Sequence, residues 1–158
     1  MQVIVFAKTK GGVAASTLCY NVALMAALKS QVFLVDLDPQ ASLRKMFDAR
    51  NELLNPRLIA DIESLAKSVR LLTQAGYDRP YMFVDTPGSL MPVITDAIGA
   101  ADLIVIPTQP SPLDLRAQDA IMDRIERMGL GGKVMHVLTR TQTNKPGIEA
   151  IDKATLYL

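Results

Sequence analysis

Residues 8–17, with the sequence KTKGGVAAST, contain the residue types that bind phosphate groups. An apolar run at residues 3–6 precedes them, and Ser16 and Thr17 stand where a helical pattern begins. A strand, a glycine-rich turn and a Ser or Thr that opens a helix wrap backbone N–H groups around phosphates. The segment therefore predicts a phosphate-binding loop, although Ala14 and Ala15 occupy the two positions where a working loop carries Gly and Lys.

Five short apolar runs are the predicted strands that position this loop. The runs are continuous rather than alternating, which is typical of strands buried on both faces of a sheet. They span residues 3–7, 32–36, 81–85, 103–107 and 134–139. Residues 51–57 are predicted to form an irregular surface loop, with Asn55-Pro56 as a turn signal.

Segments with helical spacing separate or follow these runs, at residues 17–28, 62–72, 90–98, 113–128 and 148–158. Strands that alternate with helices imply right-handed crossovers and a mostly parallel sheet covered on both faces, which is a doubly wound α/β fold. Ligands of such sheets bind at the carboxyl ends of the strands. Polar motifs fall at four of these ends: after Ala7, at Asp36, at Asp85 and after Ile106.

Composition predicts one globular domain, because the 158 residues are 49% hydrophobic and 21% charged. The 17 Lys plus Arg and 16 Asp plus Glu give no reason to expect nucleic-acid binding through whole-molecule charge. Cys19 is the single cysteine, so an internal disulfide and a multi-cysteine cluster are excluded, and we expect it to pack in the core. We find no signal-peptide pattern and no apolar run long enough to span a membrane, and we expect a cytoplasmic protein.

Four motifs, in order along the chain, resemble those of the ParA/MinD family of deviant Walker-type ATPases. The loop resembles the family's Lys-Gly-Gly-x-Gly-Lys-Ser/Thr, in which the early lysine corresponds to Lys10. Residues 35–40, VDLDPQ, are similar to the family's second-strand signature, and residues 83–88, FVDTPG, to its Walker B strand. Residues 105–108 (VIPT) and 111–114 (SPLD) look like those of the small ParF-type plasmid-partition proteins. The resemblance covers residues 1 to 142 and implies the P-loop NTPase fold.

The resemblance implies a role for each matching residue. Lys10 would reach phosphates across a dimer interface, and Asp38 would orient or polarise the attacking water. Ser16 would be a Mg²⁺ ligand, Asp36 would support the metal shell and Asp85 would hold a metal-bound water. The residues implied to line the ATP or ADP site are Gly11, Gly12, Val13, Ala14, Ala15, Ser16, Thr17 and Arg140. The alternative for the three aspartates is that they cap helices or turns at strand ends.

Ala14 and Ala15 depart from the family pattern in a way that impairs the predicted site. Alanine at position 15 cannot supply the ammonium that bridges the β- and γ-phosphates, and position 14 requires a backbone conformation that is costly for a residue with a Cβ. Loss of a charge-assisted phosphate contact costs about 1.5–3 kcal/mol in binding. We therefore expect hydrolysis to be very weak or absent. Lys8 could substitute for the lost lysine, although a solvated surface lysine is the interpretation that we favour.

The resemblance also implies partners and a longer C-terminal region. Family members dimerise, bind nonspecific DNA in the ATP state and act with a ParB-like or other adaptor protein, so association with the nucleoid is a further expectation. A further strand and helices complete the family's sheet and base pocket, and we expect this chain, a single domain over residues 1–158, to lack them. Arg140 would then face an incomplete pocket.

Several other features have ordinary structural explanations. His136 stands alone inside an apolar strand pattern and is expected to be packed rather than catalytic. The charged side chains of residues 116–127 are expected to form a solvated face, with a partner or dimer surface as the alternative. A basic cluster at Arg44, Lys45 and Arg50 leaves local DNA contact open.

Three functions therefore stand as hypotheses. The first is an ATP-dependent dimerisation switch for partition of DNA or positioning of cargo. The second is a nucleotide-independent interaction module that retains the fold. The third, a membrane-associated switch, is disfavoured because residues 148–158 contain only Lys153 against Glu149 and Asp152, which is not a basic amphipathic helix.

Overall fold

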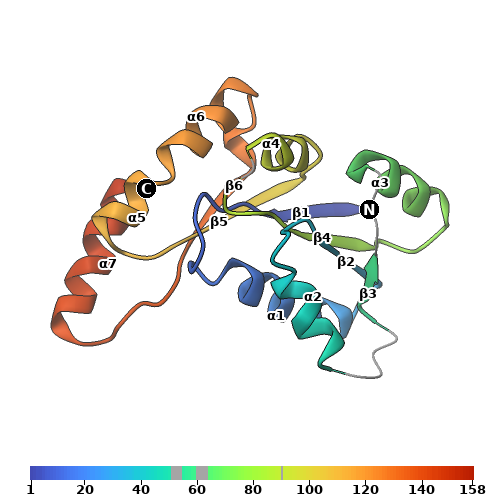
Figure 1. The fold of residues 1–158 in the computed structure, drawn as a ribbon, viewed down its shortest axis with the longest axis horizontal. Coiled ribbons are helices and arrows are strands. Elements are labelled where there is room, and N and C mark those ends of the chain that lie inside the picture. The colour runs from blue at the N-terminus through green and yellow to red at the C-terminus, as the bar shows by residue number, and fades with distance from the viewer. Residues whose placement is uncertain (51–54, 60–63, 90) are drawn as a thin grey trace.

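A computed structural model describes residues 1–50, 55–59, 64–89 and 91–158, and within them it contains one six-stranded sheet (Figure 1). All strand pairs are parallel, and the order across the sheet is β3-β2-β4-β1-β5-β6. The strands are β1 (Gln2–Phe6), β2 (Val32–Asp36), β3 (Arg57–Ile59), β4 (Tyr81–Asp85), β5 (Leu103–Thr108) and β6 (Val134–Leu138). The predicted doubly wound α/β fold is confirmed.

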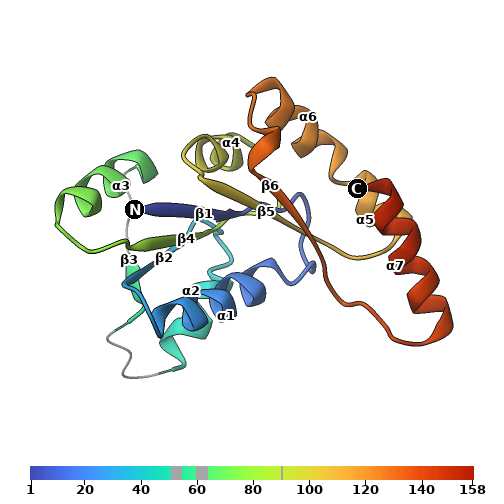
Figure 2. The same ribbon diagram turned by 180° about the vertical axis from the view of Figure 1, so that it is seen from behind.

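Helices cover both faces of this sheet. They are α1 (Ala15–Ala27), α2 (Ser42–Asp48), α3 (Leu65–Gln74), α4 (Met91–Gly99), α5 (Pro112–Arg116), α6 (Asp119–Arg127) and α7 (Lys145–Tyr157), with a short 3₁₀ turn, η1, at Gly131–Lys133. Helices α1 and α2 lie on one face, and α3, α4 and α6 lie on the other (Figures 1 and 2). Helices α5 and α7 pack side by side beyond the β6 edge.

The continuous apolar strands are explained by two hydrophobic clusters, one on each face of the sheet. Strand side chains that alternate in direction divide between them, as Phe6 and Leu34 do for the cluster under α1 and α2, and Val5 and Val35 for the cluster under α3, α4 and α6. Cys19 belongs to the first cluster and is 0% exposed. Burial raises the pKa of its thiol, and the prediction that Cys19 is core packing is confirmed.

Two elements were not predicted from the sequence. Strand β3 begins at Arg57, so the predicted irregular loop is wrong at this residue, whereas residues 51–54 lie outside the part that the structure describes. A run of three residues at the edge of a sheet is too short to show a period. Helix α2 has seven residues and no side-chain N-cap, so it lacked both of the signals that mark a helix in a sequence.

The predicted helix at residues 113–128 is two helices. Between α5 and α6 the backbone bonds tighten, with Gln118 N–H donating to the Leu115 carbonyl and Ile121 N–H to the Gln118 carbonyl. Such bonds from residue i to residue i−3 interrupt the α-helical ladder. Of the apolar positions in the predicted helix, Ile121 and Ile125 are buried, whereas Leu113 is exposed. The predicted starts at Ile62 and Leu90 fall outside the described residues, and the described parts of those helices begin at Leu65 and Met91.

The strand order brings the polar strand ends together. Strand β4 lies between β2 and β1, and the registers align Asp85 with Asp36 on one side and with Phe6 on the other. The loop that follows β1 therefore begins beside Asp85. At this point the chain from β1 continues to β2 on one side of the pair β1 and β4, and the chain from β4 continues to β5 on the other side. A doubly wound sheet opens a crevice at such a point.

Candidate functional site

The loop between β1 and α1 encloses an open pocket of about 460 Å³ at the carboxyl ends of the strands. Its lining comes from the loop, from the segment after β2, from α2 and from the segment after β6. The lining residues are Lys8, Gly11, Gly12, Val13, Ala14, Ala15, Ser16, Thr17, Asp38, Gln40, Ser42, Lys45, Met46 and Arg140. The structure thus brings all eight residues of the predicted nucleotide site into one pocket.

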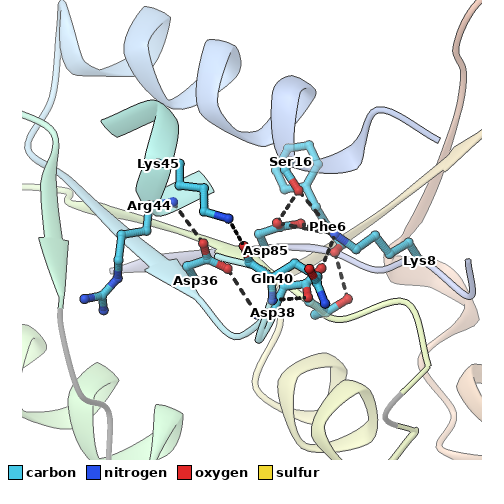
Figure 3. Close-up of polar contacts among 10 residues, drawn as sticks. Phe6, Lys8, Ser16, Asp36, Asp38, Gln40, Arg44, Lys45 and Asp85 are labelled. Carbon is cyan, nitrogen blue, oxygen red and sulfur yellow. Dashed lines mark hydrogen bonds and ion pairs between the residues drawn. The ribbon is translucent and has the colours of Figure 1, made fainter. Parts of the chain in front are cut away.

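Lys8 lies at the centre of the polar contacts in this pocket (Figure 3). Its Nζ lies 3.0 Å from Asp38 Oδ2, 3.3 Å from Asp85 Oδ1 and 3.2 Å from Ser16 Oγ. The residue is only 6% exposed, so the favoured interpretation of Lys8 as a solvated surface lysine is wrong. The sequence could not show this, because the two carboxylates that hold the ammonium lie far from it along the chain.

Asp85 is 0% exposed and lies behind the pocket lining, in contact with Lys8 and Ser16. Its Oδ2 accepts a hydrogen bond of 2.5 Å from Ser16 Oγ, in addition to the contact with Lys8. Burial raises the pKa of Asp85 above its usual value, and the Lys8 charge and the Ser16 hydroxyl offset only part of that rise. A buried carboxylate at the end of a central strand is thus held by one ammonium and one hydroxyl.

Asp36 and Asp38 organise the turn that follows β2. Asp36 Oδ1 accepts from Asp38 N–H at 3.0 Å, and its Oδ2 accepts from Arg44 N–H at 2.9 Å, which fixes the start of α2. Asp38 Oδ1 accepts from Gln40 N–H at 3.0 Å, while Oδ2 faces Lys8. Asp36 therefore caps the turn and the helix after β2, which was the alternative to a role at a metal ion. Asp38 both shapes the turn and lines the pocket.

The loop backbone adopts the conformations that its predicted function requires. Gly12 has a φ of 82° and Ala14 a φ of 62°, both in the left-handed region. Position 14 thus has the left-handed backbone conformation that was expected to be energetically costly for a residue with a Cβ. Gln109 Nε2 donates to the Gly12 carbonyl and Thr139 Oγ1 to the Val13 carbonyl, each at 3.0 Å, which anchors the loop to the segments after β5 and β6. Gln109 was not singled out in the sequence.

Lys10 lies outside the pocket lining, on the other side of the loop. Its Nζ is paired with Asp114 Oδ1, and Asp114 also accepts from the Ser111 hydroxyl. Ser111 Oγ in turn accepts from Asp114 N–H and so caps α5. Burial would raise the pKa of Asp114, but the hydrogen bonds from Lys10 and Ser111 outweigh it and lower the pKa. The implied role of Lys10 toward a second subunit stays a prediction.

The predicted Mg²⁺ ligands do not fit a metal ion in this arrangement. Ser16 and Asp85 bond to each other, the Lys8 ammonium lies against both, and the Asp36 carboxylate is engaged by two backbone N–H groups. Among the described residues there is no group of three or more His, Cys, Asp or Glu side chains that could hold a metal. A divalent cation would need the oxygens that Lys8 contacts.

The remaining predicted residues lie apart from the pocket. His136 lies in β6, half-buried, and its burial lowers the pKa of the imidazole, so its predicted place in a packed strand is confirmed. The charged side chains of α6 are exposed, as predicted: Asp119, Asp123, Arg124, Glu126 and Arg127. None of the described helices is long and apolar enough to cross a membrane.

Comparison with known proteins supplies the family. An AAA-domain family model, AAA_31, matches residues 1–63. The chain is 32% identical over 163 residues to the maintenance of carboxysome distribution protein A of Gloeobacter kilaueensis, an alignment that covers 96% of this chain and 68% of that protein. The chain belongs to the ParA/MinD family. The resemblance seen in its motifs is confirmed.

Other ParA/MinD proteins agree with this assignment. The protein ParA of Rhizobium radiobacter is 29% identical over 147 residues, with 91% of this chain and 66% of that protein covered. A plasmid partition protein of Borrelia burgdorferi bound to AMPPNP has a TM-score of 0.79 at 21% identity, covering 96% of this chain and 79% of that one. A chain of the MinC:MinD cell division protein complex of Aquifex aeolicus has a TM-score of 0.80 at 20% identity, covering 100% of this chain and 78% of that one. The chain spans 56–68% of the length of the first three curated relatives.

Proposed function

We propose that this ParA/MinD chain is a nucleotide-dependent dimerisation switch for partition of DNA or positioning of a cargo, with weak or absent ATP hydrolysis. The observation that carries the proposal is the pocket lined by the loop backbone, Ser16 and Asp38, with Asp85 buried behind Ser16. Relatives named for chromosome partition and for carboxysome distribution support the same class of function. The Borrelia structure contains AMPPNP, which supports ATP or ADP as the ligand.

Slow hydrolysis follows from the composition of the loop. Phosphoryl transfer depends on positioning and on neutralisation of the charge that develops on the γ-phosphoryl group. Ala15 supplies no charge from the start of α1, where the family pattern has lysine. Asp38, the residue proposed to orient water, is paired with Lys8. The site therefore keeps its shape and loses part of its capacity to stabilise the transition state.

The proposed partners follow from the same switch. In the nucleotide-bound state two copies would associate and bind nonspecific DNA, and a ParB-like or other adaptor protein would act on that state. The complex of MinD with MinC supports an adaptor as a class of partner. Arg44 and Lys45 on α2, beside the pocket, are the basic residues proposed to contact DNA.

Light scattering during size-exclusion chromatography tests the proposal. The chain is passed over the column without nucleotide, with ADP and with ATP, and binding of a labelled DNA duplex is measured in the same buffers by fluorescence anisotropy. We expect a dimer and DNA binding with ATP only. A chain that remains monomeric and ignores DNA in every buffer would overturn the switch.

Phosphate release measures the impairment separately. A variant with Ala14→Gly and Ala15→Lys should hydrolyse ATP at least about tenfold faster than the unaltered chain, because a charge-assisted phosphate contact is restored. Equal rates would show that the two alanines are not the cause of slow hydrolysis.

A nucleotide-independent interaction module is the second candidate. It is favoured by Ala14 and Ala15 in the phosphate loop, and the ion pair between Lys10 and Asp114 ties that loop to α5. Such a module would bind an active ParA/MinD homologue equally well with ATP and after nucleotide removal. Binding to a purified homologue that disappears without ATP would exclude it.

A further inference from the structure

Lys8 has no counterpart among the roles that the motifs assign. It precedes the glycine turn, at the opposite end of the loop from Ala15, yet its ammonium lies on the floor of the pocket. The side chain is 7% exposed and contacts three groups at once. A solvated lysine would lose about 2 kcal/mol of side-chain entropy by adopting one such geometry, so the contacts that hold it must be strong.

We propose that Lys8 is the phosphate-binding lysine of this loop, and that its ammonium takes the place of a divalent cation, so that ATP and ADP bind without Mg²⁺. The inference rests on the proposed function, because it concerns the same nucleotide pocket. It assigns to one residue the charge that the loop lacks at Ala15 and the charge that Ser16 and Asp85 would otherwise receive from a metal.

The geometry of the ammonium supports the first half of this proposal. An ammonium within 3.4 Å of Ser16 Oγ, Asp38 Oδ2 and both oxygens of Asp85 lies between the helix that starts at Ala15 and the ends of β2 and β4. Phosphate groups that accept hydrogen bonds from the loop N–H groups would lie in the same pocket as the Lys8 ammonium. Lysine binds phosphate as a point charge on a flexible stem, so it can be supplied from either end of a loop.

The contacts of Ser16 and Asp85 support the second half. Mg²⁺ requires near-octahedral oxygen ligands at about 2.0–2.1 Å, and the oxygens available on the pocket floor already contact the Lys8 ammonium or each other. A metal ion and an ammonium on the same oxygens would repel each other, strongly where both are shielded from water. Mg²⁺ would therefore have to displace Lys8, whereas a free nucleotide would not.

The charge of the pocket lining favours an anion without an added cation. Lys8, Lys45 and Arg140 line the pocket, and they face the Asp38 carboxylate in the lining and the Asp85 carboxylate buried behind Lys8; Lys45 and Arg140 are exposed. Lys45 Nζ donates to the Gln40 carbonyl, and no ion pair with a carboxylate of the described residues holds its charge. The lining therefore has an excess of positive charge that a diphosphate or triphosphate complements.

Calorimetric titration of ATP and ADP tests the proposal in two buffers, one with Mg²⁺ and one with EDTA. The unaltered chain should bind at least as tightly in EDTA as in Mg²⁺. Lys8→Met should weaken binding about tenfold or more in EDTA, because a charge-assisted phosphate contact is lost. Lys29→Met, which removes an exposed lysine outside the pocket, is the matched control and should change affinity less than about twofold.

The competing explanation is that Lys8 only neutralises Asp85 in the fold. Removal of Lys8 alone leaves a buried carboxylate without its partner and could unfold the chain. A variant with both Lys8→Met and Asp85→Asn removes the two charges together and should fold, as measured by circular dichroism. Binding of ATP in EDTA by this folded double variant with unchanged affinity would overturn the proposal, and a loss of about tenfold or more supports it.

The unaltered chain gives an answer that does not depend on any variant. Binding of ATP that requires Mg²⁺ overturns the proposal for Lys8 while leaving the nucleotide switch intact. Binding of neither nucleotide in either buffer overturns the switch as well. Tight binding in EDTA without dimerisation would support Lys8 and count against the switch.

Discussion

At the scale of single residues, the loop is shaped by backbone conformation as much as by charge. Ala14 has a φ of 62° and a ψ of 21°, a left-handed conformation that costs a residue with a Cβ about 1–2 kcal/mol. Lys8, seven positions before Ala15, supplies the ammonium on the pocket floor. The loop thus combines a strained residue at one end with a cation supplied from the other.

Ala14→Gly should raise the free energy of unfolding by up to about 1 kcal/mol. Glycine relieves the strain at a positive φ, and the greater freedom of the unfolded chain offsets part of that gain. Urea denaturation followed by circular dichroism measures the change. Ala66→Gly, at an exposed position within α3, should shift the free energy in the opposite direction by about 0.5–1 kcal/mol, because glycine is a poorer helix former.

At the scale of elements, short helices fix the loops that carry the site. Asp36 accepts from the backbone at the start of α2, and Ser111 Oγ accepts from Asp114 N–H at the start of α5. Lys10 joins the phosphate loop to α5 through Asp114. A substitution that displaces α2 or α5 is therefore expected to alter the conformation of the loops that carry the site.

The stability of the α5 cap should depend on acid pH. The pKa of Asp114 in the folded chain lies below its usual value, so the ionised carboxylate stabilises the fold above about pH 4. That contribution is lost as the pH falls from about 4 through the folded-state pKa. Thermal unfolding between pH 7 and pH 3 should show a smaller loss of stability for Asp114→Asn than for the unaltered chain. Parallel curves for the two proteins would contradict this assignment.

Gly147→Ala should loosen α7. A Cβ at Gly147 would lie 2.4 Å from the Gln142 carbonyl oxygen, so the first turn of the helix would have to move. Such overpacking costs about 1–3 kcal/mol, and hydrogen exchange of the α7 amides should rise accordingly. Gly132→Ala is the control, because a Cβ there meets no heavy atom within 4 Å, and it should leave α7 exchange unchanged.

At the scale of the whole molecule, the lysines of the loop lie in different surroundings. The pocket side carries Lys8, Ser16 and Asp38, whereas Lys10 lies outside the lining and is paired with Asp114. The resemblance of the loop motif predicts that Lys10 reaches the nucleotide of a second subunit. Opening of the Lys10 pair would accordingly accompany dimerisation.

Lys10→Met should separate nucleotide binding from dimerisation. The monomer should keep its affinity for ATP within about threefold, because the ammonium of Lys10 does not line the pocket, while the ATP-dependent dimer should weaken at least about tenfold. Analytical ultracentrifugation with and without ATP measures both species, with Lys153→Met on α7 as an exposed-lysine control. A dimer of unchanged strength would contradict the role of Lys10 in trans.

The sequence by itself determined the α/β fold class, five of the six described strands and eight residues that the structure places in one pocket. These follow from local patterns: continuous apolar runs, helical spacing and motifs placed directly after strands. Strand β3 was not predicted because three residues are too few to show a period. Helix α2 was not predicted because it has only seven residues and no side-chain N-cap.

The position of Lys8 was decided only by the tertiary structure. Its partner Asp38 lies in the turn after β2 and its partner Asp85 ends β4, and the strand order β2-β4-β1 brings both beside the loop. The pairing of Lys10 with Asp114 likewise depends on how α5 packs against the loop. Charge pairs between distant segments leave no periodic signal in a sequence, because what places them is the packing of the sheet rather than the spacing of the chain.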